Sequence, residues 1–202
     1  MEFSRYSLSL NEVRLEPLQP HHLPGLTAAI ADGNLHELFL TIVPAPERLQ
    51  AFLAKALADY QAGLGLTYAI IYQPDNTVIG STRFMRAVPE HRRVEIGFTF
   101  LAQRFQRTGV NTTAKYLLLC QAFEQMDCLR VEFLTDCLNR RSRNAIERIG
   151  AKYEGLLRKH MQMRDGRIRD SVLYSITADE WPGVKQHLTF MMQNPPTDTA
   201  AR

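Results

Sequence analysis

Cysteine is scarce in this chain, and the few cysteines follow no disulfide or metal-binding pattern. There are three, an odd number, with no CxxC pair among Cys120, Cys128 and Cys137. This argues against a disulfide framework and favours reduced thiols. The six histidines form no cluster with ligand spacing, because His21 and His22 are adjacent and would diverge on a helix. We therefore expect no metal site.

Long apolar runs are also missing. No stretch approaches the ~18 consecutive apolar residues that a membrane-spanning helix needs. The first residues, MEFSRYSLSLNEV, lack the apolar segment of a signal peptide. Both absences predict a cytoplasmic protein with no membrane partner. The formal net charge of +3 permits an anionic ligand but is too small to indicate a nucleic-acid partner.

Two phosphate-binding motifs are absent as well. The chain contains neither GxxxxGKS nor GxxxxGKT, and it contains no GxGxxG, so it has no P-loop and no dinucleotide-binding fingerprint. With 202 residues, of which 45% are apolar and 22% charged, the composition is that of a globular protein. We expect residues 1–190 to form one domain and residues 191–202 to form a disordered tail.

The periodicity of apolar residues predicts meander strands followed by alternating strands and helices. The expected strands are residues 12–18, 67–73, 77–86, 92–101, 130–136, 151–162 and 168–177. The expected helices lie within residues 20–34, 46–61, 109–127, 139–149 and 179–193. This order predicts an α+β (mixed α/β) protein, with a mixed central sheet and helices on its faces.

The strand RRVEIGFTFL (92–101) places a carboxylate beside a glycine. A glycine within a strand often marks a bulge or the close approach of a ligand or another backbone. Glu95 is therefore a candidate functional group, with an exposed residue of an edge strand as the alternative. Strict alternation would direct Val94, Ile96, Phe98 and Phe100 to one face and Glu95, Gly97 and Thr99 to the other.

The segment QRFQRTGVNTTAKYLLLCQAF (103–123) carries basic and amide side chains at the start of an apolar helix. The first four N–H groups of a helix lack intrahelical partners and, together with the helix dipole, attract an anion. Gly109 permits close approach to the backbone, and Arg104 and Arg107 add positive charge. The alternative is an ordinary capped helix with solvated arginines.

A second basic helix lies within NRRSRNAIERIGAKYEG (139–155). Asn139 is expected to cap this helix, Ser142 lies on the same side by its i, i+3 spacing, and Gly150 ends the helix. The arginines on this helix form either a solvated face or a surface for phosphates. They are Arg140, Arg141, Arg143 and Arg148.

These pieces occur in one order: a strand with EIGF, a loop in which Arg104 precedes Gly109 by five residues, and Asn-x-x-Ser in a helix that ends at Gly-Ala-x-Tyr-Glu-Gly. In that combination the chain resembles the GNAT superfamily of acetyl-CoA-dependent N-acetyltransferases, and within it the RimJ/RimL-type branch. The later segments EGLLRKHM and DGRIRDSVLYSI are also similar to that branch. The resemblance extends from about residue 11 to residue 190 and implies a mostly antiparallel central sheet with helices on both faces.

The resemblance implies transfer of an acetyl group from acetyl-CoA, as a cosubstrate, to a primary amine such as a protein N-terminal α-amine. The reaction that the resemblance implies requires no metal ion. Glu95 would act as the base, directly or through a water molecule. Ser142 would protonate the leaving thiolate, with Tyr153 as the alternative acid, and Asn139 would orient the ligand or the amine.

The same resemblance places the cofactor on the strand end and the loop that follows. The strand backbone would pair with the pantetheine arm as an added strand and offer N–H groups to the thioester carbonyl, while the loop would hold the pyrophosphate. The implied cofactor-binding residues are Phe98, Thr99, Phe100, Leu101, Arg104, Gln106, Arg107, Thr108, Gly109, Val110, Asn111, Thr112, Asn139 and Ser142.

Arg107 departs from the family pattern, which commonly has glycine at this position. If the position requires a positive φ, a residue other than glycine costs roughly 1 kcal/mol there. A contact between the guanidinium and a phosphate would offset that cost.

Three alternatives remain open at this point. The acceptor is either a protein N-terminus or a small molecule such as an amino acid, a polyamine or an antibiotic. The same fold could serve as a non-catalytic module that binds RNA, the ribosome or CoA. A monomer and a homodimer both fit the sequence.

Overall fold

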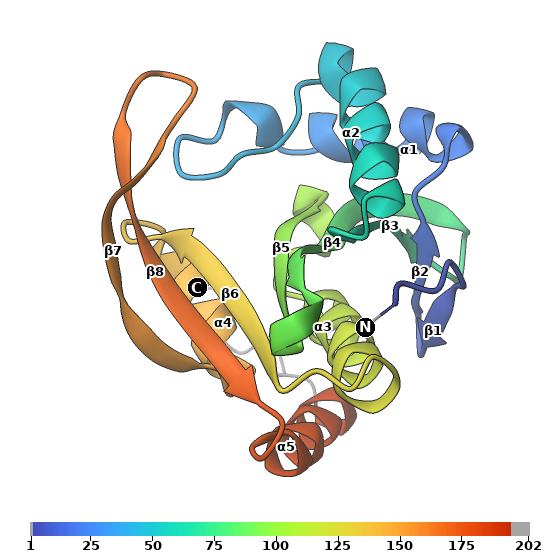
Figure 1. Ribbon diagram of the computed structural model, residues 1–202. Helices are drawn as coiled ribbons and strands as arrows, with labels where there is room; N and C mark the ends of the chain where they lie inside the picture. Colours follow the sequence, from blue (N-terminus) through green and yellow to red (C-terminus); the bar gives the residue numbers. More distant parts are fainter. Residues whose placement is uncertain (1, 195–202) are drawn as a thin grey trace, which may run out of the picture.

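A computed structural model of the protein describes residues 2–194, and within them the chain forms one eight-stranded sheet (Figure 1). The strands lie in the order β1-β2-β3-β4-β5-β6-β8-β7. They are β1 (Leu8–Leu10), β2 (Val13–Pro17), β3 (Leu66–Tyr72), β4 (Thr77–Val88), β5 (Arg93–Leu101), β6 (Arg130–Asp136), β7 (Lys152–Gln162) and β8 (Ile168–Thr177). The α-helices are α1 (Leu23–Ala31), α2 (Leu49–Gln61), α3 (Val110–Cys120), α4 (Arg140–Arg148) and α5 (Trp181–Gln193).

Two inner strands, β5 and β6, are parallel and pair over only a short length. Their register joins Arg93–Glu95 to Arg130–Glu132, and beyond these residues the strands part, as Figure 1 shows. The other neighbouring strands in the described part of the chain are antiparallel. The predicted mixed, mostly antiparallel sheet is therefore confirmed. From Ile96 onward, the β5 edge that faces β6 has no strand partner among residues 2–194.

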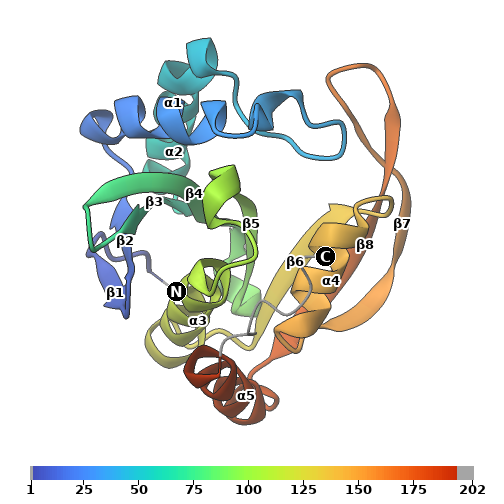
Figure 2. The ribbon, with the colours of Figure 1, turned by 180° about the vertical axis from the view of Figure 1, so that it is seen from behind.

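Helices cover both faces of the sheet and enclose two apolar cores (Figure 2). The larger core lies under α3 and α5 and contains Val94 and Ile96 of β5. The smaller core lies between α1, α2 and the opposite face, where Ala69 of β3 and Phe100 of β5 contribute. Burial of these apolar side chains supplies most of the driving force for folding.

Strand β5 does not alternate strictly, which corrects one expectation from the sequence. Phe98 has φ +47°, and the register between β4 and β5 shifts at this point, so the strand carries a β-bulge. After the bulge, Phe100 lies in the smaller core and Leu101 lies in the larger one with Ile96. The prediction that Phe98 and Phe100 share the face of Val94 is therefore wrong.

The two ends of the described chain differ in small ways from what the sequence predicts. The short strand β1 was not expected from the sequence. Helix α5 continues to Gln193, so a tail that begins at residue 191 is placed too early, and residues 195–202 lie outside the described residues. Among residues 2–194, none of the helices combines the length and the hydropathy required to cross a bilayer.

Candidate active site

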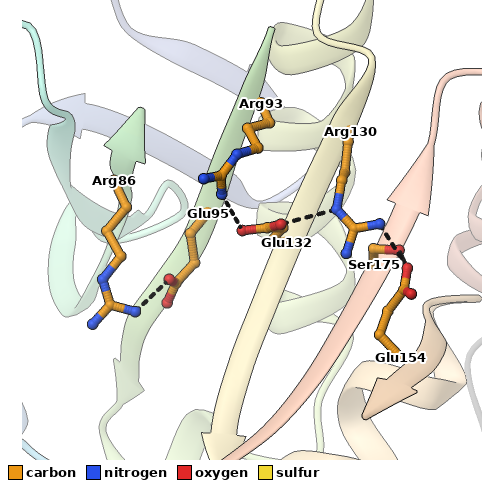
Figure 3. Close-up of polar contacts among 7 residues, drawn as sticks. All are labelled: Arg86, Arg93, Glu95, Arg130, Glu132, Glu154 and Ser175. Carbon is orange, nitrogen blue, oxygen red and sulfur yellow. Dashed lines mark hydrogen bonds and ion pairs between the residues drawn. The ribbon is translucent and has the colours of Figure 1, made fainter. Parts of the chain in front are cut away.

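Glu95 is buried at the last position where β5 pairs with β6. Its side chain accepts a hydrogen bond of 2.9 Å from Nη1 of Arg86 (Figure 3). The residue is 6% exposed, so the alternative of an exposed edge residue is wrong. Burial raises the pKa of this carboxyl, although the charge and hydrogen bond of Arg86 oppose the increase. A Cβ atom on Gly97 would lie 3.1 Å from Glu95 Oε1, so the glycine leaves space for the carboxylate.

Glu132, the β6 residue that pairs with Glu95 in the register, has a different environment. It accepts hydrogen bonds from Nη1 of Arg93 at 3.0 Å and from Nε of Arg130 at 2.9 Å. Arg130 also donates to Glu154 at 2.6 Å, which extends the ion-pair chain across the sheet (Figure 3). Glu132 therefore forms ion pairs with two arginines, whereas Glu95 forms one, and that arginine is half exposed.

Helix α3 begins with little side-chain capping, since only the Thr108 hydroxyl accepts one of its first N–H groups, that of Val110, at 3.3 Å. Its N-cap is Gly109, where an added Cβ atom would lie in open space. The preceding loop turns at Arg107 with φ +64°, which confirms the conformation that favours glycine and costs roughly 1 kcal/mol. Unpaired N–H groups at a helix start form an anion site. Among residues 2–194, no acceptor faces the backbone N–H groups of Arg107, Thr108, Gly109, Asn111 and Thr112.

A polar pocket of about 410 Å³ opens beside this helix start. Arg141, in the first turn of α4, donates a 2.6 Å hydrogen bond to Oε1 of Gln106, so the loop and α4 meet here. Arg104 turns away to Asp32, with 3.7 Å between its Nε and the carboxylate. The pocket is lined by Gly33, Leu35, Leu38, Gln103, Gln106, Arg107 and Arg141.

The predicted N-cap of α4 is confirmed. The Asn139 side chain accepts a 3.0 Å hydrogen bond from the Ser142 backbone N–H, so these two residues meet at the helix start. The Ser142 hydroxyl has no hydrogen-bond partner within the described part of the chain. Tyr153 is 57% exposed and packs edge-to-face on Tyr174, at 5.9 Å between ring centroids. No hydrogen bond among residues 2–194 joins Asn139 or Ser142 to Glu95.

Several of the expected cofactor-binding residues direct their side chains into the protein. Phe100, Leu101 and Val110 lie in the cores, and the buried Thr112 hydroxyl accepts a hydrogen bond from Arg148. At these residues only the backbone remains to contact a ligand. The Leu101 carbonyl already accepts a 2.7 Å hydrogen bond from the Gln106 side chain.

Thr99 is bound to a buried lysine that the sequence analysis did not single out. Lys115 of α3 is 6% exposed and donates to the Thr99 hydroxyl at 2.5 Å and to the Thr82 hydroxyl at 3.3 Å. Burial lowers the pKa of Lys115 to about 7, because no carboxylate offsets the loss of water. The sequence did contain a signal for the burial of this lysine. Lys115 is spaced four and seven residues from the apolar Leu119 and Ala122, which places it on the apolar face of the helix.

Three of the four arginines of α4 donate hydrogen bonds to other residues of the protein. Arg141 binds Gln106, Arg143 binds the Tyr174 hydroxyl and the Cys137 carbonyl, and Arg148 binds Thr112. Arginines held in this way are poorly placed to form an extended surface for RNA phosphates.

One cluster of possible metal ligands lies away from this region. The sequence expectation that His21 and His22 diverge is wrong, since their rings lie 3.9 Å apart and their ligand atoms approach those of Glu16. However, His22 Nδ1 accepts the Gln19 backbone N–H at 3.1 Å, so the ring proton is on Nε2 and points to Glu16 at 3.0 Å. Nε2 then has no lone pair for an ion. The absence of a metal stays a prediction.

Comparison with known proteins places these features in a family. Residues 12–152 match the acetyltransferase (GNAT) domain. The chain belongs to the GNAT family. It is 31% identical over 121 residues to YdaF of Bacillus subtilis (strain 168), named as a candidate ribosomal N-acetyltransferase; this match covers 60% of the chain and 64% of YdaF. The chain therefore spans slightly less than two thirds of that curated relative.

Solved structures agree with this assignment. A candidate acetyltransferase from T. thermophilus is 36% identical, with a TM-score of 0.82 and coverage of 94% of this chain and 98% of that one. Mycobacterium smegmatis RimJ in complex with CoA-disulfide has a TM-score of 0.77 and covers 92% of both chains. At 22% identity, RimJ shows the fold alone. The expected resemblance to the RimJ/RimL-type branch of the GNAT family is confirmed.

Proposed function

We propose that this GNAT protein transfers an acetyl group from acetyl-CoA to a primary amine. The observation that carries the proposal is the junction of β5 and α3. There, a strand edge without a partner among residues 2–194 leads through the loop of residues 102–109 into α3, and five N–H groups of this loop and the first helical turn have no acceptor among the described residues. An extended arm that ends in a pyrophosphate suits both features, because main-chain groups pair with the arm and the helix start binds the anion. The CoA-disulfide bound by the RimJ neighbour supports the same ligand class.

Glu95 is the proposed base. An amine attacks a thioester only when it is neutral, and an α-amine with a pKa of about 7.7–8 requires little assistance at neutral pH. The amine nitrogen forms a bond to the carbonyl carbon, the carbon–sulfur bond breaks, and the proton of the amine passes to Glu95. The raised pKa of this carboxyl makes it a better proton acceptor than an ordinary surface glutamate.

Ser142 and Asn139, at the start of α4, are the groups proposed to act on the leaving thiolate. The Ser142 hydroxyl is free to donate a proton or a hydrogen bond to the leaving thiolate, and Asn139 fixes the turn that presents it. Tyr153 is the weaker candidate, because its ring packs on Tyr174. Arg107 and Arg141 border the pocket that would hold the phosphates.

The acceptor is proposed to be an α-amine, either of a protein N-terminus or of a small molecule. The curated relative YdaF, named for ribosomal N-acetylation, supports the first choice. The second candidate, a non-catalytic CoA-binding module, is motivated by the non-glycine residue at the strained position 107.

Thermal melts with and without acetyl-CoA test the cofactor site. Ligand at about 100 times Kd stabilises by about 2.7 kcal/mol, or roughly 5–10 °C for a chain of this length. The expected shift is absent with an unrelated anion of similar charge. Release of the CoA thiol in the presence of a panel of amines then separates the enzyme from the module, since only the enzyme releases it faster than buffer does. No shift at millimolar acetyl-CoA would contradict both.

A further inference from the structure

The ammonium group of Lys115 connects three elements of the fold. It belongs to α3 and donates hydrogen bonds to the hydroxyls of Thr99 on β5, at 2.5 Å, and Thr82 on β4, at 3.3 Å. The two hydroxyls lie 2.8 Å apart. Lys115 is buried, and within residues 2–194 these two hydroxyls are its hydrogen-bond partners. The three side chains are here called the Lys115 cluster.

The cluster lies at the bulge of β5. The register of β4 and β5 places Phe98 and Thr99 opposite the single residue Thr82, so the cluster joins the two strands at the irregularity itself. Phe98 has φ +47°, a left-handed conformation that residues with a bulky side chain rarely adopt. Strained conformations of this kind persist only where the surrounding contacts hold them.

Side chains on both faces of the sheet contact the bulge. Lys115 reaches Thr99 from the face that α3 covers. Arg83 lies on the other face, because it follows Thr82 directly along β4, and its guanidinium stacks on the Phe98 ring at 3.8 Å. Of these two contacts, the one from Lys115 also ties the bulge to a helix. The hydrogen bonds of Lys115 therefore relate the position of the bulge to that of α3.

The Lys115 cluster lies between the two parts of the proposed cofactor site. The bulge begins three residues after Glu95, where the pairing of β5 with β6 ends, and a bulge bends its strand (Figure 1). The backbone of residues 98–101 is the part of this open edge that would pair with the pantetheine arm. Lys115 lies five residues after Val110, the first residue of α3, where the pyrophosphate would bind. One buried side chain thus connects the two surfaces that a single ligand would contact.

The buried ammonium is unfavourable for stability. Burial lowers the pKa of Lys115 to about 7, and no carboxylate among residues 2–194 forms an ion pair with it. An apolar side chain of similar length could fill the same space without removing a charge from water. A buried polar group that reduces stability is expected where it fixes a geometry that function requires.

We propose that Lys115 is a positioning residue for acetyl-CoA. By binding Thr99 and Thr82, it holds the bulge of β5 in the conformation that receives the pantetheine arm, at a fixed distance from the start of α3. The inference rests on the proposed acetyltransferase function and adds a residue that acts through the strand. Because Lys115 is buried behind Thr99, it is expected to affect the binding of the cofactor and not the chemical step.

Two variants break the cluster at residues that lie away from the ligand. Lys115→Met removes the ammonium and keeps the length of the side chain. Thr82→Val removes one hydroxyl and keeps the shape of the side chain, whereas Thr82→Ser keeps the hydroxyl. Thr82 is 0% exposed, so neither Thr82 variant changes a group that a ligand could touch. Ile176→Val is the matched control, because Ile176 of β8 is buried in the same core and lies outside the β5–α3 junction.

Acetyl-CoA binding is measured by calorimetry, and the free energy of unfolding by denaturant melts. Lys115→Met is expected to weaken binding at least about tenfold, yet to unfold at a higher denaturant concentration than the wild type, since it lacks the buried cation. Thr82→Val is expected to weaken binding at least about fivefold. Thr82→Ser and Ile176→Val are expected to stay within about twofold of the wild type.

Kinetics give a second readout. In Lys115→Met and Thr82→Val, the KM for acetyl-CoA is expected to rise by the same factor as the dissociation constant, with kcat within about threefold of the wild type. A purely structural role would instead lower stability and affinity together. If a melt shows that Lys115→Met does not fold, the comparison of Thr82→Val with Thr82→Ser decides.

The outcomes separate the two proposals. Weaker acetyl-CoA binding in Lys115→Met and Thr82→Val, with near-normal binding in Thr82→Ser and Ile176→Val, supports the positioning role. Normal binding in the first two variants overturns it, as does an equal loss in all four, and the wild type's own acetyl-CoA binding then leaves the proposed function intact. Failure of the wild type to bind acetyl-CoA overturns the proposed function and the positioning role together.

Discussion

Two neighbouring strand–helix units, β5–α3 and β6–α4, begin from equivalent positions and use their polar groups in opposite ways. In β6–α4, Glu132 is held by two arginines and Asn139 caps the helix. In β5–α3, Glu95 is buried against one half-exposed arginine, Gly109 offers no capping side chain, and the loop turns at a strained Arg107.

The difference is the one expected between a unit whose polar groups pair within the protein and a unit whose polar groups a ligand would pair. Unpaired N–H groups, a positive φ at a residue other than glycine and a buried carboxylate each reduce stability. Such features concentrate where a protein binds or reacts, because a ligand compensates for them. The contrast agrees with the proposal that β5–α3 carries the base and the cofactor loop, while β6–α4 contributes only the groups at the start of its helix, Asn139 and Ser142.

The largest expected effect is a loss of kcat/KM when Glu95, but not Glu132, is replaced by glutamine. Glu95→Gln should lower kcat/KM by about 10²–10⁴-fold, since it removes the proposed base. In the wild type, the acid limb of the pH profile should lie above the ordinary carboxyl range, because burial raises the pKa of Glu95. Glu132→Gln is the control and should remain within about tenfold of wild type per folded protein. Equal losses in both variants would contradict the assignment of Glu95 alone.

The next prediction concerns Lys115, a buried lysine of α3, and the free energy of unfolding. Lys115→Met should raise the free energy of unfolding at pH 7 by about 2 kcal/mol, since it removes a buried cation but also two hydrogen bonds. The Thr82 and Thr99 hydroxyls are 2.8 Å apart and remain hydrogen-bonded to each other. Denaturant melts at several pH values would measure the change.

The pH dependence of stability should also differ between this variant and the wild type. The pKa of Lys115 is about 7 in the folded protein and 10.5 in its ordinary state. Between these values the unfolded chain binds the proton and the folded protein does not, so wild-type stability rises with pH in this window. Below about pH 7 the penalty is complete. Lys115→Met should lose this rise, and a retained slope would show that another group causes it.

The loop proposed to hold the pyrophosphate allows a comparison between two arginines. Arg107→Gln should weaken acetyl-CoA binding about tenfold, because the guanidinium borders the polar pocket. Arg104→Gln should have a smaller effect, since Arg104 turns toward Asp32. Calorimetric titration with acetyl-CoA measures both. A larger loss for Arg104→Gln would mean that the loop rearranges on binding.

The cap of α4 should produce the smallest change. Asn139→Ala is expected to lower stability by about 1 kcal/mol, as for other N-cap residues. Asn144→Ala, at an exposed position within the same helix, should be neutral or slightly stabilising. Thermal melts compare the two. If Asn139→Ala leaves the stability unchanged, the Asn139 cap does not stabilise α4, and the difference in capping between α3 and α4 does not affect the free energy of unfolding.

Much of this contrast could be anticipated from local sequence. The Asn139 cap, the basic loop before an apolar helix and the positive φ at position 107 all depend on a few consecutive residues. Glu95 was identified for the same reason, through its neighbour Gly97. What escaped prediction was long-range: Arg86 and Arg83 approach Glu95 from β4, and the register that joins these strands cannot be read from either one.

The sequence by itself therefore determined the order of strands and helices, the family resemblance and the basic, glycine-containing loop at the β5–α3 junction. These follow from periodicity, capping and turn chemistry, which act over short distances along the chain. Only the tertiary structure decided that β5 bulges at Phe98, that Lys115 loses its water, and that this lysine binds threonines of two neighbouring strands. Burial and charge interactions depend on which segments meet in space, and that is set by the packing of the whole sheet.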